Sequence, residues 1–177
     1  MTQQPQTRPD HIGLKPVLIW QDAVILSRLA RQIWLEHYTP IIGRDQVDYM
    51  TGKFQSAAAI WRDIQSGGME YDLIVCGNQP AGYMAVRVDS HKKSMFLSKL
   101  YVERARRGQG IGRWAFGQLV DRARKASCST IWLTVNRYNS GSIAAYQKLG
   151  FHIMEAICTD IGQGYVMDDF RMEYRLS

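Results

Sequence analysis

The sequence predicts a single α/β domain built on a mixed, mostly antiparallel, twisted sheet that is flanked by helices. Three segments in the middle of the chain, 71–76, 81–88 and 95–102, are rich in apolar residues and separated by polar turns, which is typical of consecutive antiparallel strands. A glycine-rich turn and an amphipathic stretch follow them, and further strand-like and helix-like segments alternate to the end. The 177 residues are enough for one domain with a buried core.

The first part of the chain is predicted to form a strand and a long helix. Residues 14–20 are mostly apolar and form the expected strand. Asp22 is placed to cap the helix that follows. Apolar residues recur there at the spacing of one helical face, at Leu26, Leu29, Ala30 and Ile33. We expect this helix to end at Thr39-Pro40, because a proline disfavours helical geometry in the residue before it.

Two short helices are predicted next, over 45–54 and 57–64, and Gly67-Gly68 ends the second one. The three apolar segments then pair as antiparallel neighbours, with Gly77-Asn78-Gln79-Pro80 as the first turn. The remaining expected elements are a helix over 111–126, a buried strand over 130–135, a helix over 140–149 that stops before Gly150, and strands over 151–158 and 165–176.

Composition and charge exclude several classes of protein. Apolar residues make up 46% of the chain and charged residues 21%, as in an ordinary soluble globular protein. The net charge of +6 favours anionic ligands, yet no signature of a DNA- or RNA-binding module is present, so we expect no nucleic-acid partner. No run approaches the roughly 18 apolar residues of a membrane span, so we expect no membrane partner either.

The cysteines and the first residues indicate the cellular compartment. Cys76, Cys128 and Cys158 are widely spaced, which fits neither a disulfide framework nor a zinc site, so we expect no metal and a reducing, cytoplasmic location. Residues 1–12 are polar and lack the apolar core of a signal peptide. We expect them to form a disordered arm, and the domain to cover 13–177.

The most informative stretch is the turn Arg107-Gly108-Gln109-Gly110-Ile111-Gly112. It lies between a predicted strand and a predicted helix, so its backbone N–H groups gather at the positive end of a helix dipole, where anions bind. Glycine lets the backbone approach a phosphate closely. Arginines surround the turn, at Arg104, Arg106, Arg107 and Arg113. We therefore predict a site for a phosphorylated ligand.

Two common phosphate-binding turns do not fit this stretch. A P-loop requires Gly-x-x-x-x-Gly-Lys-Ser/Thr, and no Lys-Ser/Thr pair follows Gly112. A dinucleotide-binding turn has the spacing Gly-x-Gly-x-x-Gly within a parallel βαβ unit. Here the glycines alternate, and the strands before them are expected to be antiparallel.

A segment further along the chain identifies the ligand. Arg107-x-x-Gly110-x-Gly112, Asn136-x-x-Asn139 and Ser142-x-x-x-Tyr146-x-Lys148-x-Gly150-Phe151 together resemble the GNAT superfamily of acetyl-CoA-dependent N-acetyltransferases. Many members carry alanine where this chain has Ser142. The motifs span residues 107–151, and the order of predicted elements is similar to the family over nearly the whole chain. The resemblance implies a GNAT-like domain that transfers acetyl from acetyl-CoA to a primary amine by direct attack.

The same resemblance implies roles for individual residues. The turn would bind the pyrophosphate of CoA, mainly through backbone N–H groups, with Arg107, Gly108, Gln109, Gly110, Ile111, Gly112 and Arg113. The backbone of Leu100 and Val102 would pair with the pantetheine arm as an added strand does. Tyr146 stands at the position of the general acid that protonates the departing thiolate, unless it only packs in the core. Asn139 either contacts the cofactor or caps the helix after it.

A narrower resemblance, to the PaiA-like branch associated with polyamine acetylation, rests on Tyr38-Thr39-Pro40, 46–50, Lys53-Phe54 and 168–172. It implies a small amine or a polyamine as the substrate. Four aromatic residues either line the acceptor site or belong to the core, namely Trp34, Tyr38, Tyr49 and Phe54. Five acids either attract a cationic amine or are merely solvated or structural, namely Glu36, Asp48, Glu70, Asp168 and Asp169.

Three points stay open in the sequence. The general base is Glu70, an ordered water or another group. The acceptor is a small amine or, as the alternative, a protein N-terminus or lysine, and a CoA-binding regulator without turnover is a third alternative. Homodimerisation through the end strands is common for this fold and remains an option.

Overall fold

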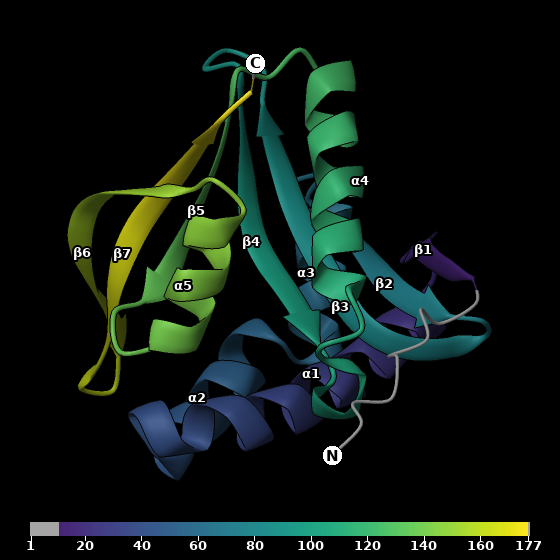
Figure 1. Ribbon diagram of the computed structural model, residues 1–177. Coiled ribbons are helices and arrows are strands. Elements are labelled where there is room, and N and C mark those ends of the chain that lie inside the picture. The colour runs from purple at the N-terminus through teal and green to yellow at the C-terminus, as the bar shows by residue number, and fades with distance from the viewer. Residues whose placement is uncertain (1–10, 177) are drawn as a thin grey trace, which may run out of the picture.

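The computed structural model describes residues 11–176, and within them seven strands form one sheet in the order β1-β2-β3-β4-β5-β7-β6 (Figure 1). The strands are β1 (Ile12–Pro16), β2 (Glu70–Cys76), β3 (Gln79–Asp89), β4 (Ser94–Val102), β5 (Thr130–Asn136), β6 (His152–Gly162) and β7 (Tyr165–Arg175). Neighbouring strands are antiparallel except β4 and β5, which are parallel. The predicted fold class is confirmed. Of the expected disordered arm, residues 1–10 lie outside the described range.

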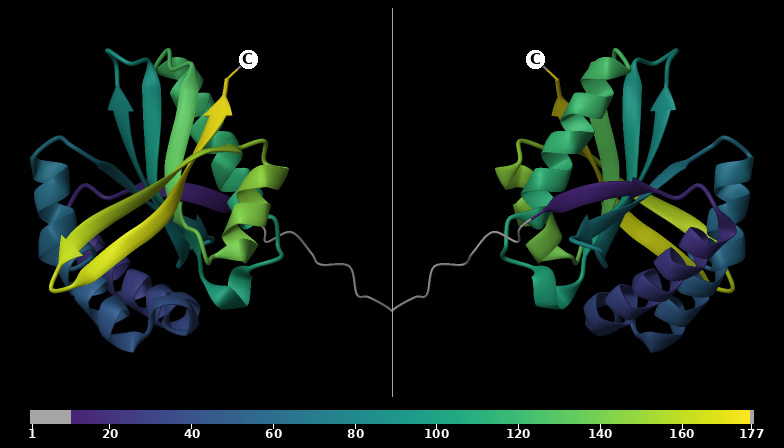
Figure 2. Two further views of the ribbon diagram at one scale, coloured as in Figure 1. Left: turned by 90° about the vertical axis from the view of Figure 1, so that its left-hand side faces the viewer. Right: turned by 90° about the vertical axis from the view of Figure 1, so that its right-hand side faces the viewer.

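Helices cover both faces of the sheet. They are α1 (Trp20–Ile42), α2 (Arg44–Phe54), α3 (Ala57–Gln65), α4 (Ile111–Lys125) and α5 (Ser140–Lys148), and a short 3₁₀ helix, η1 (Arg104–Arg106), precedes α4. In Figure 1, α4 and α5 lie in front of the sheet, whereas α1 and α2 lie below it and α3 behind it. The side views show the β6–β7 hairpin running obliquely toward α2 and α3 (Figure 2).

Two clusters of buried side chains hold these helices in place. α4 packs on the sheet through Phe116, Leu119, Val120 and Ala123. On the other face, α1 and α3 pack through Leu26, Leu29, Ile33 and Ile60. Met84 and Val86 of β3 belong to the first cluster, and Tyr83 and Ala85 to the second, because side chains alternate between the faces of a strand. Each fully buried leucine or isoleucine contributes about 1.5–3 kcal/mol of transfer free energy.

The parallel strands β4 and β5 are joined at one end only. Their pairing stops at Phe96 and Trp132, and beyond these residues the strands diverge. On its other side, β4 stays paired with β3 as far as Val102. The backbone of residues 97–102 is therefore bonded toward β3 and open toward β5.

A β-bulge in β4 decides which side chains face the space between these strands. The register with β3 shifts by one residue here and leaves Ser98 without a partner. Since side chains alternate along a strand, one extra residue reverses the alternation. Phe96 and Ser98 before the shift therefore share a face with Lys99 and Tyr101 after it.

Two predictions for the N-terminal elements are wrong. The first strand covers Ile12–Pro16 rather than 14–20, because Ile19 is already the N-cap of α1. Asp22 is therefore not the cap. It lies buried in the first turn of the helix, where the helix dipole favours a negative charge, and its Oδ1 accepts a hydrogen bond of 2.7 Å from Lys15 Nζ.

The helix also continues past Pro40, contrary to the expectation from sequence. α1 ends at Ile42, and the N–H of Gly43 donates to the carbonyl oxygen of Thr39 across 3.0 Å. A proline removes the hydrogen bond to the residue four positions earlier, and this loss matters less in the last turn of a helix of 23 residues. The remaining elements lie within a few residues of their predicted ranges.

Candidate active site

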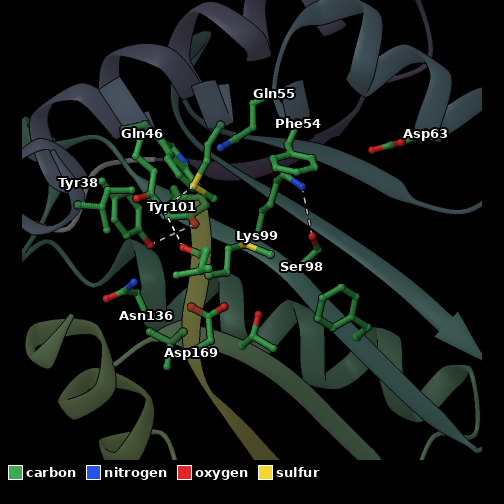
Figure 3. A pocket seen from close by; sticks show the side chains of 18 residues that line it. Tyr38, Gln46, Phe54, Gln55, Asp63, Ser98, Lys99, Tyr101, Asn136 and Asp169 are labelled. Carbon is green, nitrogen blue, oxygen red and sulfur yellow. Dashed lines mark hydrogen bonds between the residues drawn. The ribbon is translucent and has the colours of Figure 1, made fainter. Parts of the chain in front are cut away.

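A cavity of about 250 Å³ lies where β4 and β5 diverge, between these strands and the helices α1, α2 and α3 (Figure 3). β7 supplies a further wall, so segments from most of the chain meet at this place. Its polar lining includes Tyr38, Gln55, Lys99, Tyr101, Asn136 and Asp169. A concave site with a few polar groups among apolar ones is typical of small-molecule binding.

Aromatic side chains of α1 and β4 form one wall of the cavity. The phenol oxygens of Tyr38 and Tyr101 lie 3.3 Å apart. The ring centroids of Trp34 and Tyr38 are 4.4 Å apart, and Tyr101 meets Trp34 edge-on. Burial raises the pKa of both phenols, so both remain protonated near neutral pH. This wall therefore offers hydroxyl groups to a ligand.

Asp169 of β7 lies on the opposite wall, and its carboxylate points into the cavity (Figure 3). Burial raises the pKa of Asp169, a hydrogen bond from Thr134 opposes the rise, and the charge of Asp168 adds to it. The carboxylate also lies close enough to Tyr38 to raise the pKa of that phenol. A carboxylate with a raised pKa is a better proton acceptor than an ordinary aspartate.

Tyr146 lies on α5, against the cluster under α4. Its ring meets Phe151 edge-on, with centroids 5.4 Å apart. Burial raises the pKa of the Tyr146 phenol, and Tyr38 adds to the rise. Tyr146 thus packs in the core, as the alternative to a catalytic role anticipated. Its phenol is nevertheless protonated and close enough to Tyr38 to be affected by it, and the role of Tyr146 as general acid stays a prediction.

The glycine turn has the shape of an anion site. Gly108 and Gly110 adopt φ angles of 78° and 80°, a conformation that costs other residues about 1–2 kcal/mol. Gly110 is the N-cap of α4 and has no side chain to bond the first N–H groups of that helix. A Cβ added to Gly110 or Gly112 would meet no atom within 4 Å. Space is therefore open beside the N-terminus of α4, and the binding of a pyrophosphate there stays a prediction.

The side chains of the turn contribute unequally. Ile111 is 1% exposed and belongs to the core, so it can offer a ligand only its N–H group. The amide of Gln109 donates to the carbonyl oxygen of Ala105 across 3.4 Å. Arg113 is exposed and available to an anion, whereas Arg107 is also exposed but is bonded to the carbonyl oxygen of Val102.

The backbone of Leu100 and Val102 faces the open edge of β4. The N–H of Glu103 donates to the carbonyl oxygen of Ala81 on β3 across 2.8 Å. Because backbone groups alternate in direction along a strand, those of Val102 and Leu100 point away from β3. Nε of Arg107 donates to the carbonyl oxygen of Val102 across 3.0 Å. An extended ligand that displaces Arg107 could pair with this edge, in the manner of an added strand.

Asn139 caps α5 and also contacts α1. Its Oδ1 accepts a hydrogen bond of 3.3 Å from the N–H of Ser142, and its Nδ2 lies 3.0 Å from Nε2 of His37. Nδ1 of His37 lies 3.4 Å from the guanidinium of Arg107. Burial and then Arg107 lower the pKa of His37, while Asn139 raises it. Capping is the role of Asn139 that the structure shows, and a cofactor contact stays a prediction.

Three of the four aromatic candidates for the acceptor site line the cavity, namely Trp34, Tyr38 and Phe54. Tyr49 does not line it. Its hydroxyl donates to the carbonyl oxygen of Ile161 across 2.6 Å, and its ring packs on Tyr165. Tyr49 therefore fastens α2 to the β6–β7 hairpin.

Of the five candidate acids, Asp169 alone is among the residues that line the cavity in the described part of the chain. Glu36 is exposed on α1. Asp48 forms ion pairs with Arg31 and Arg44, and Arg44 contributes most to lowering the pKa of its carboxyl group. Glu70 lies 3.6 Å from Arg122 of α4. Helix α4 covers the face of the sheet that is opposite to the cavity. Because Glu70 lies on that side, it is not retained as the general base.

The neighbours Asp168 and Asp169 have different surroundings. Asp168 forms an ion pair of 2.8 Å with Arg137 and accepts the backbone N–H of that residue at its carbonyl oxygen. Asp168 shares its strand face with Met172, which is fully buried, whereas Asp169 faces the other way. This difference could have been found in the sequence. In a strand, Asp168 and the apolar Met172 share a face because they are four positions apart, whereas Asp169 lies on the opposite face.

Sequence reasoning missed Lys99, Tyr101 and Gln55, which all line the cavity. Strict alternation along β4 would place Lys99 beside Leu97, which packs toward α4. The bulge at Ser98 reverses this placement, and a bulge leaves no clear mark in the sequence. A lysine inside an otherwise apolar strand was the available signal.

Some features are lacking in residues 11–176. No group of three or more His, Cys, Asp or Glu side chains there could hold a metal ion. None of the helices in this range combines the length and the hydropathy required to cross a membrane. The three cysteines, all within this range, are free thiols.

Three curated proteins share parts of the sequence. Streptothricin acetyltransferase of Streptomyces lavendulae is 32% identical over 71 residues, which are 40% of this chain and 38% of that protein. N-acetyltransferase 8F1 of Mus musculus is 26% identical over 131 residues, which are 72% and 55%. Ribosomal protein bS18-alanine N-acetyltransferase of Escherichia coli K12 is 41% identical over 44 residues, which are 25% and 30%. The chain thus spans less than two thirds of each of these relatives.

Two solved structures share the fold. PaiA N-acetyltransferase from Thermoplasma acidophilum, in complex with coenzyme A, superposes with a TM-score of 0.78 at 21% identity, over 93% of this chain and 99% of that one. Spermidine N-acetyltransferase from Vibrio cholerae, in complex with CoA and spermine, gives 0.67 at 14% identity, over 93% and 95%. At these identities the likeness concerns the fold alone.

A sequence profile described as the acetyltransferase (GNAT) family matches residues 31–151, which is more than half of the chain. The matched range begins within α1 and ends just after α5, so it includes the glycine turn, the open edge of β4 and Tyr146. The chain belongs to the GNAT family of acetyltransferases.

Proposed function

We propose that this protein transfers the acetyl group of acetyl-CoA to the primary amine of a small molecule held in the cavity between β4 and β5. The observation that carries the proposal is the divergence of these strands after Phe96 and Trp132. It leaves an unpaired backbone edge on β4, near the glycine turn, and it opens the cavity beside that edge. A donor bound along the edge and an amine bound in the cavity meet at the same place.

The residues around the open edge fit acetyl-CoA. The N–H groups at the start of α4 suit a pyrophosphate, with Gly108, Gly110 and Gly112 allowing close approach and Arg113 adding charge. The backbone of Leu100 and Val102 suits the amide groups of a pantetheine arm. Arg107 would exchange its bond to Val102 for the bound phosphate. Acetyl-CoA supplies the thioester from which the acetyl group passes to the amine.

Asp169 is the proposed proton acceptor. An aliphatic amine has a pKa of about 10, so it enters largely as an ammonium ion and must lose a proton before it can attack. The carboxylate of Asp169 faces the cavity, first pairs with the ammonium and then takes its proton. The raised pKa of Asp169 favours this transfer, and its partial burial strengthens the attraction to a cation.

Tyr146 is the proposed proton donor. A departing thiolate resembles that of cysteine, whose pKa is about 8.5, and a phenol beside it can supply the proton that completes CoA thiol. Burial keeps the phenol protonated, so it is always in the form that donates. One proton thus passes from the ammonium to Asp169 before the attack, and Asp169 releases it to solvent. After the attack the nitrogen loses a second proton, which balances through solvent the proton that Tyr146 gives to sulfur.

The acceptor is proposed at the level of a small primary amine. A polyamine, expected from the PaiA-like resemblance, is supported by the names of two relatives in fold, PaiA and the spermidine enzyme. A peptide N-terminus is the alternative, and the local match to the bS18-alanine enzyme favours it. A homodimer is the remaining expectation, and β6 offers a free sheet edge with Ile153 and Met154 exposed.

A thiol-release assay tests the proposal. The protein and acetyl-CoA are mixed in turn with polyamines, amino carboxylates, aminoglycosides and peptides, and CoA binding is measured separately by calorimetry. We expect CoA to bind and at least one small amine to release thiol at a rate that saturates. If CoA binds but no acetyl group is transferred to any of these acceptors, the result would contradict the proposed acetyltransferase activity and favour a CoA-binding regulator.

A further inference from the structure

We propose that the acceptor is an amino carboxylate, whose carboxylate binds to Lys99 and Gln55 while its amine faces Asp169. The inference rests on the proposed function and narrows its substrate class. Lys99 and Gln55 line the same cavity as Asp169, and they come from β4 and from the end of α2, whereas Asp169 comes from β7 (Figure 3). A molecule with one charge of each sign would satisfy both sides of the cavity.

Lys99 is a cation that lacks an ion-pair partner. No carboxylate in residues 11–176 lies within 4.0 Å of its Nζ atom. Nζ donates to the hydroxyl of Ser98 across 3.2 Å and lies 5.4 Å from the ring centroid of Tyr71. Burial lowers the pKa of Lys99 to about 8, which shows that its surroundings stabilise the positive charge poorly. A buried charge without a partner is costly, and an anionic ligand group would remove that cost.

Gln55 presents hydrogen-bond donors to the cavity. The indole N–H of Trp34 can only donate, and it donates to the hydroxyl oxygen of Tyr83 across 3.2 Å. Tyr83 has one proton of its own, and it donates that proton to Oε1 of Gln55. This chain of bonds fixes the orientation of the amide, so the NH₂ group of Gln55 is the end left for a ligand. Gln55 is 2% exposed to bulk solvent, so that ligand is the natural partner.

The nearby acid does not replace such a ligand. Asp63 also lines the cavity, but one of its oxygens accepts the hydroxyl of Tyr71 across 3.0 Å. Its charge raises the pKa of Lys99 only in part, against the larger effect of burial. A second ammonium group, such as a polyamine carries, would approach Lys99 with like charge. A carboxylate would instead accept bonds from an ammonium and an amide, which charge assistance makes strong.

Three acceptors that differ in one end group test the inference. γ-Aminobutyrate, n-butylamine and putrescine share a chain of four carbons and end in a carboxylate, a methyl and an aminomethyl group. Since the best length is set by the cavity, the same comparison is made with β-alanine and ε-aminocaproate and their amine counterparts. kcat/KM is measured by thiol release. Binding to the protein saturated with CoA is measured by calorimetry.

We expect the carboxylate to be preferred at one length at least, by about 10–100-fold over the methyl compound, since a bond to a charged group is usually of that strength. Lys99→Met should reduce the preference to near parity, Lys99→Arg should keep most of it, and Gln55→Leu should weaken it. Lys53→Met is the matched control, because Lys53 is a lysine of α2 that lies next to Phe54 and is not among the residues that line the cavity. It should keep the full preference.

Two results would overturn the inference. One is a preference for the diamine or the alkylamine at every length in the wild-type protein, by rate and by calorimetry. The other is a carboxylate preference that Lys99→Met leaves unchanged in a variant with a normal circular dichroism spectrum. Both results still include acetyl transfer, so they leave the proposed function standing. A wild-type protein that transfers acetyl to no class of amine would instead contradict the proposed function itself.

Discussion

The phenol oxygens of Tyr38 and Tyr101 lie 3.3 Å apart, although the two residues are 63 positions apart in the chain. The contact joins α1 to β4 at the cavity wall. Tyr38 is also electrostatically coupled to Asp169 and to Tyr146, because Asp169 raises the pKa of Tyr38 and Tyr38 raises that of Tyr146. The proposed proton acceptor and the proposed proton donor are thus connected through one residue.

Replacing Tyr146 by phenylalanine removes the proposed proton donor and keeps the ring that packs on Phe151. We expect kcat to fall by about 10²–10⁴-fold, the usual contribution of a positioned acid, while the Kd of CoA and the thermal stability stay nearly unchanged. Steady-state kinetics and calorimetry measure these quantities. A kcat close to that of the wild type would show that Tyr146 only packs.

Asp169→Asn should have a different signature, because it removes a group that must lose its proton before it acts. In the wild type, kcat/KM should fall as pH drops through the pKa of Asp169, which burial places above the ordinary value for aspartate. In the variant, kcat/KM should be lower by about a hundredfold or more and this acid limb should vanish. Asp168→Asn is the control, since Asp168 pairs with Arg137 outside the cavity. An acid limb that persists in Asp169→Asn would assign it to another group.

The elements that form the proposed donor half of the site could largely be predicted from the sequence. The glycine turn and Tyr146 lie in one continuous stretch, and the periodicity of α4 and the short apolar β5 fix the elements around them. Local patterns were therefore sufficient there. The acceptor half could not be predicted in the same way, because contacts such as Tyr38–Tyr101 depend on how α1 packs on a sheet formed much later in the chain.

Gly110→Glu should abolish CoA binding for two physical reasons. The residue has φ of 80°, which is strained for glutamate, and the new carboxylate would occupy the space that a pyrophosphate requires. We expect the Kd of CoA to rise by a hundredfold or more in calorimetry. Gly117→Glu on the exposed side of α4 is the matched control and should leave Kd nearly unchanged. Equal effects of both variants would point to helix α4 as a whole rather than to the turn.

Lys99→Met should stabilise the protein in a way that depends on pH. The pKa of Lys99 is lowered from its ordinary 10.5 to about 8 in the folded state. Between these pH values the unfolded chain keeps a proton that the folded chain has lost, so the free energy of unfolding of the wild type rises with pH. Below pH 8 the full destabilisation applies, and Lys99→Met should then raise the free energy of unfolding by about 3 kcal/mol. Urea unfolding at pH 7 and pH 10 measures the difference, and an equal gain at both would contradict the account.

Asn139→Ala should cost about 1 kcal/mol of unfolding free energy, because it removes the cap of α5. It should also lower the pKa of His37 further, since the bond to Asn139 raises that pKa. Asn139→Ser supplies a capping oxygen but lacks the amide group. It should therefore recover the unfolding free energy, while the pKa of His37 stays as low as in Asn139→Ala. Denaturation and NMR titration separate the two effects. Equal stability losses in both variants would argue against the cap.

Two departures from local sequence rules have the same physical origin. Pro40 was expected to end α1 and does not, and strict alternation along β4 would place Lys99 on the face that α4 covers, where it does not lie. In both cases a local rule gave way to tertiary packing, through a helix end that tolerates a lost bond and a bulge that reverses a strand. The second departure matters more, because it brings Lys99 and Tyr101 into the cavity.

The central claim is that one acetyl group passes from acetyl-CoA to one amine in the cavity between β4 and β5. The most direct test is to quantify both products by mass spectrometry, using the best acceptor found in the screen. The account predicts acetylated amine and free CoA in equal amounts in the wild type, and almost none of either when Asp169→Asn is saturated with acetyl-CoA. Free CoA without acetylated amine, or equal rates in the two proteins, would contradict it.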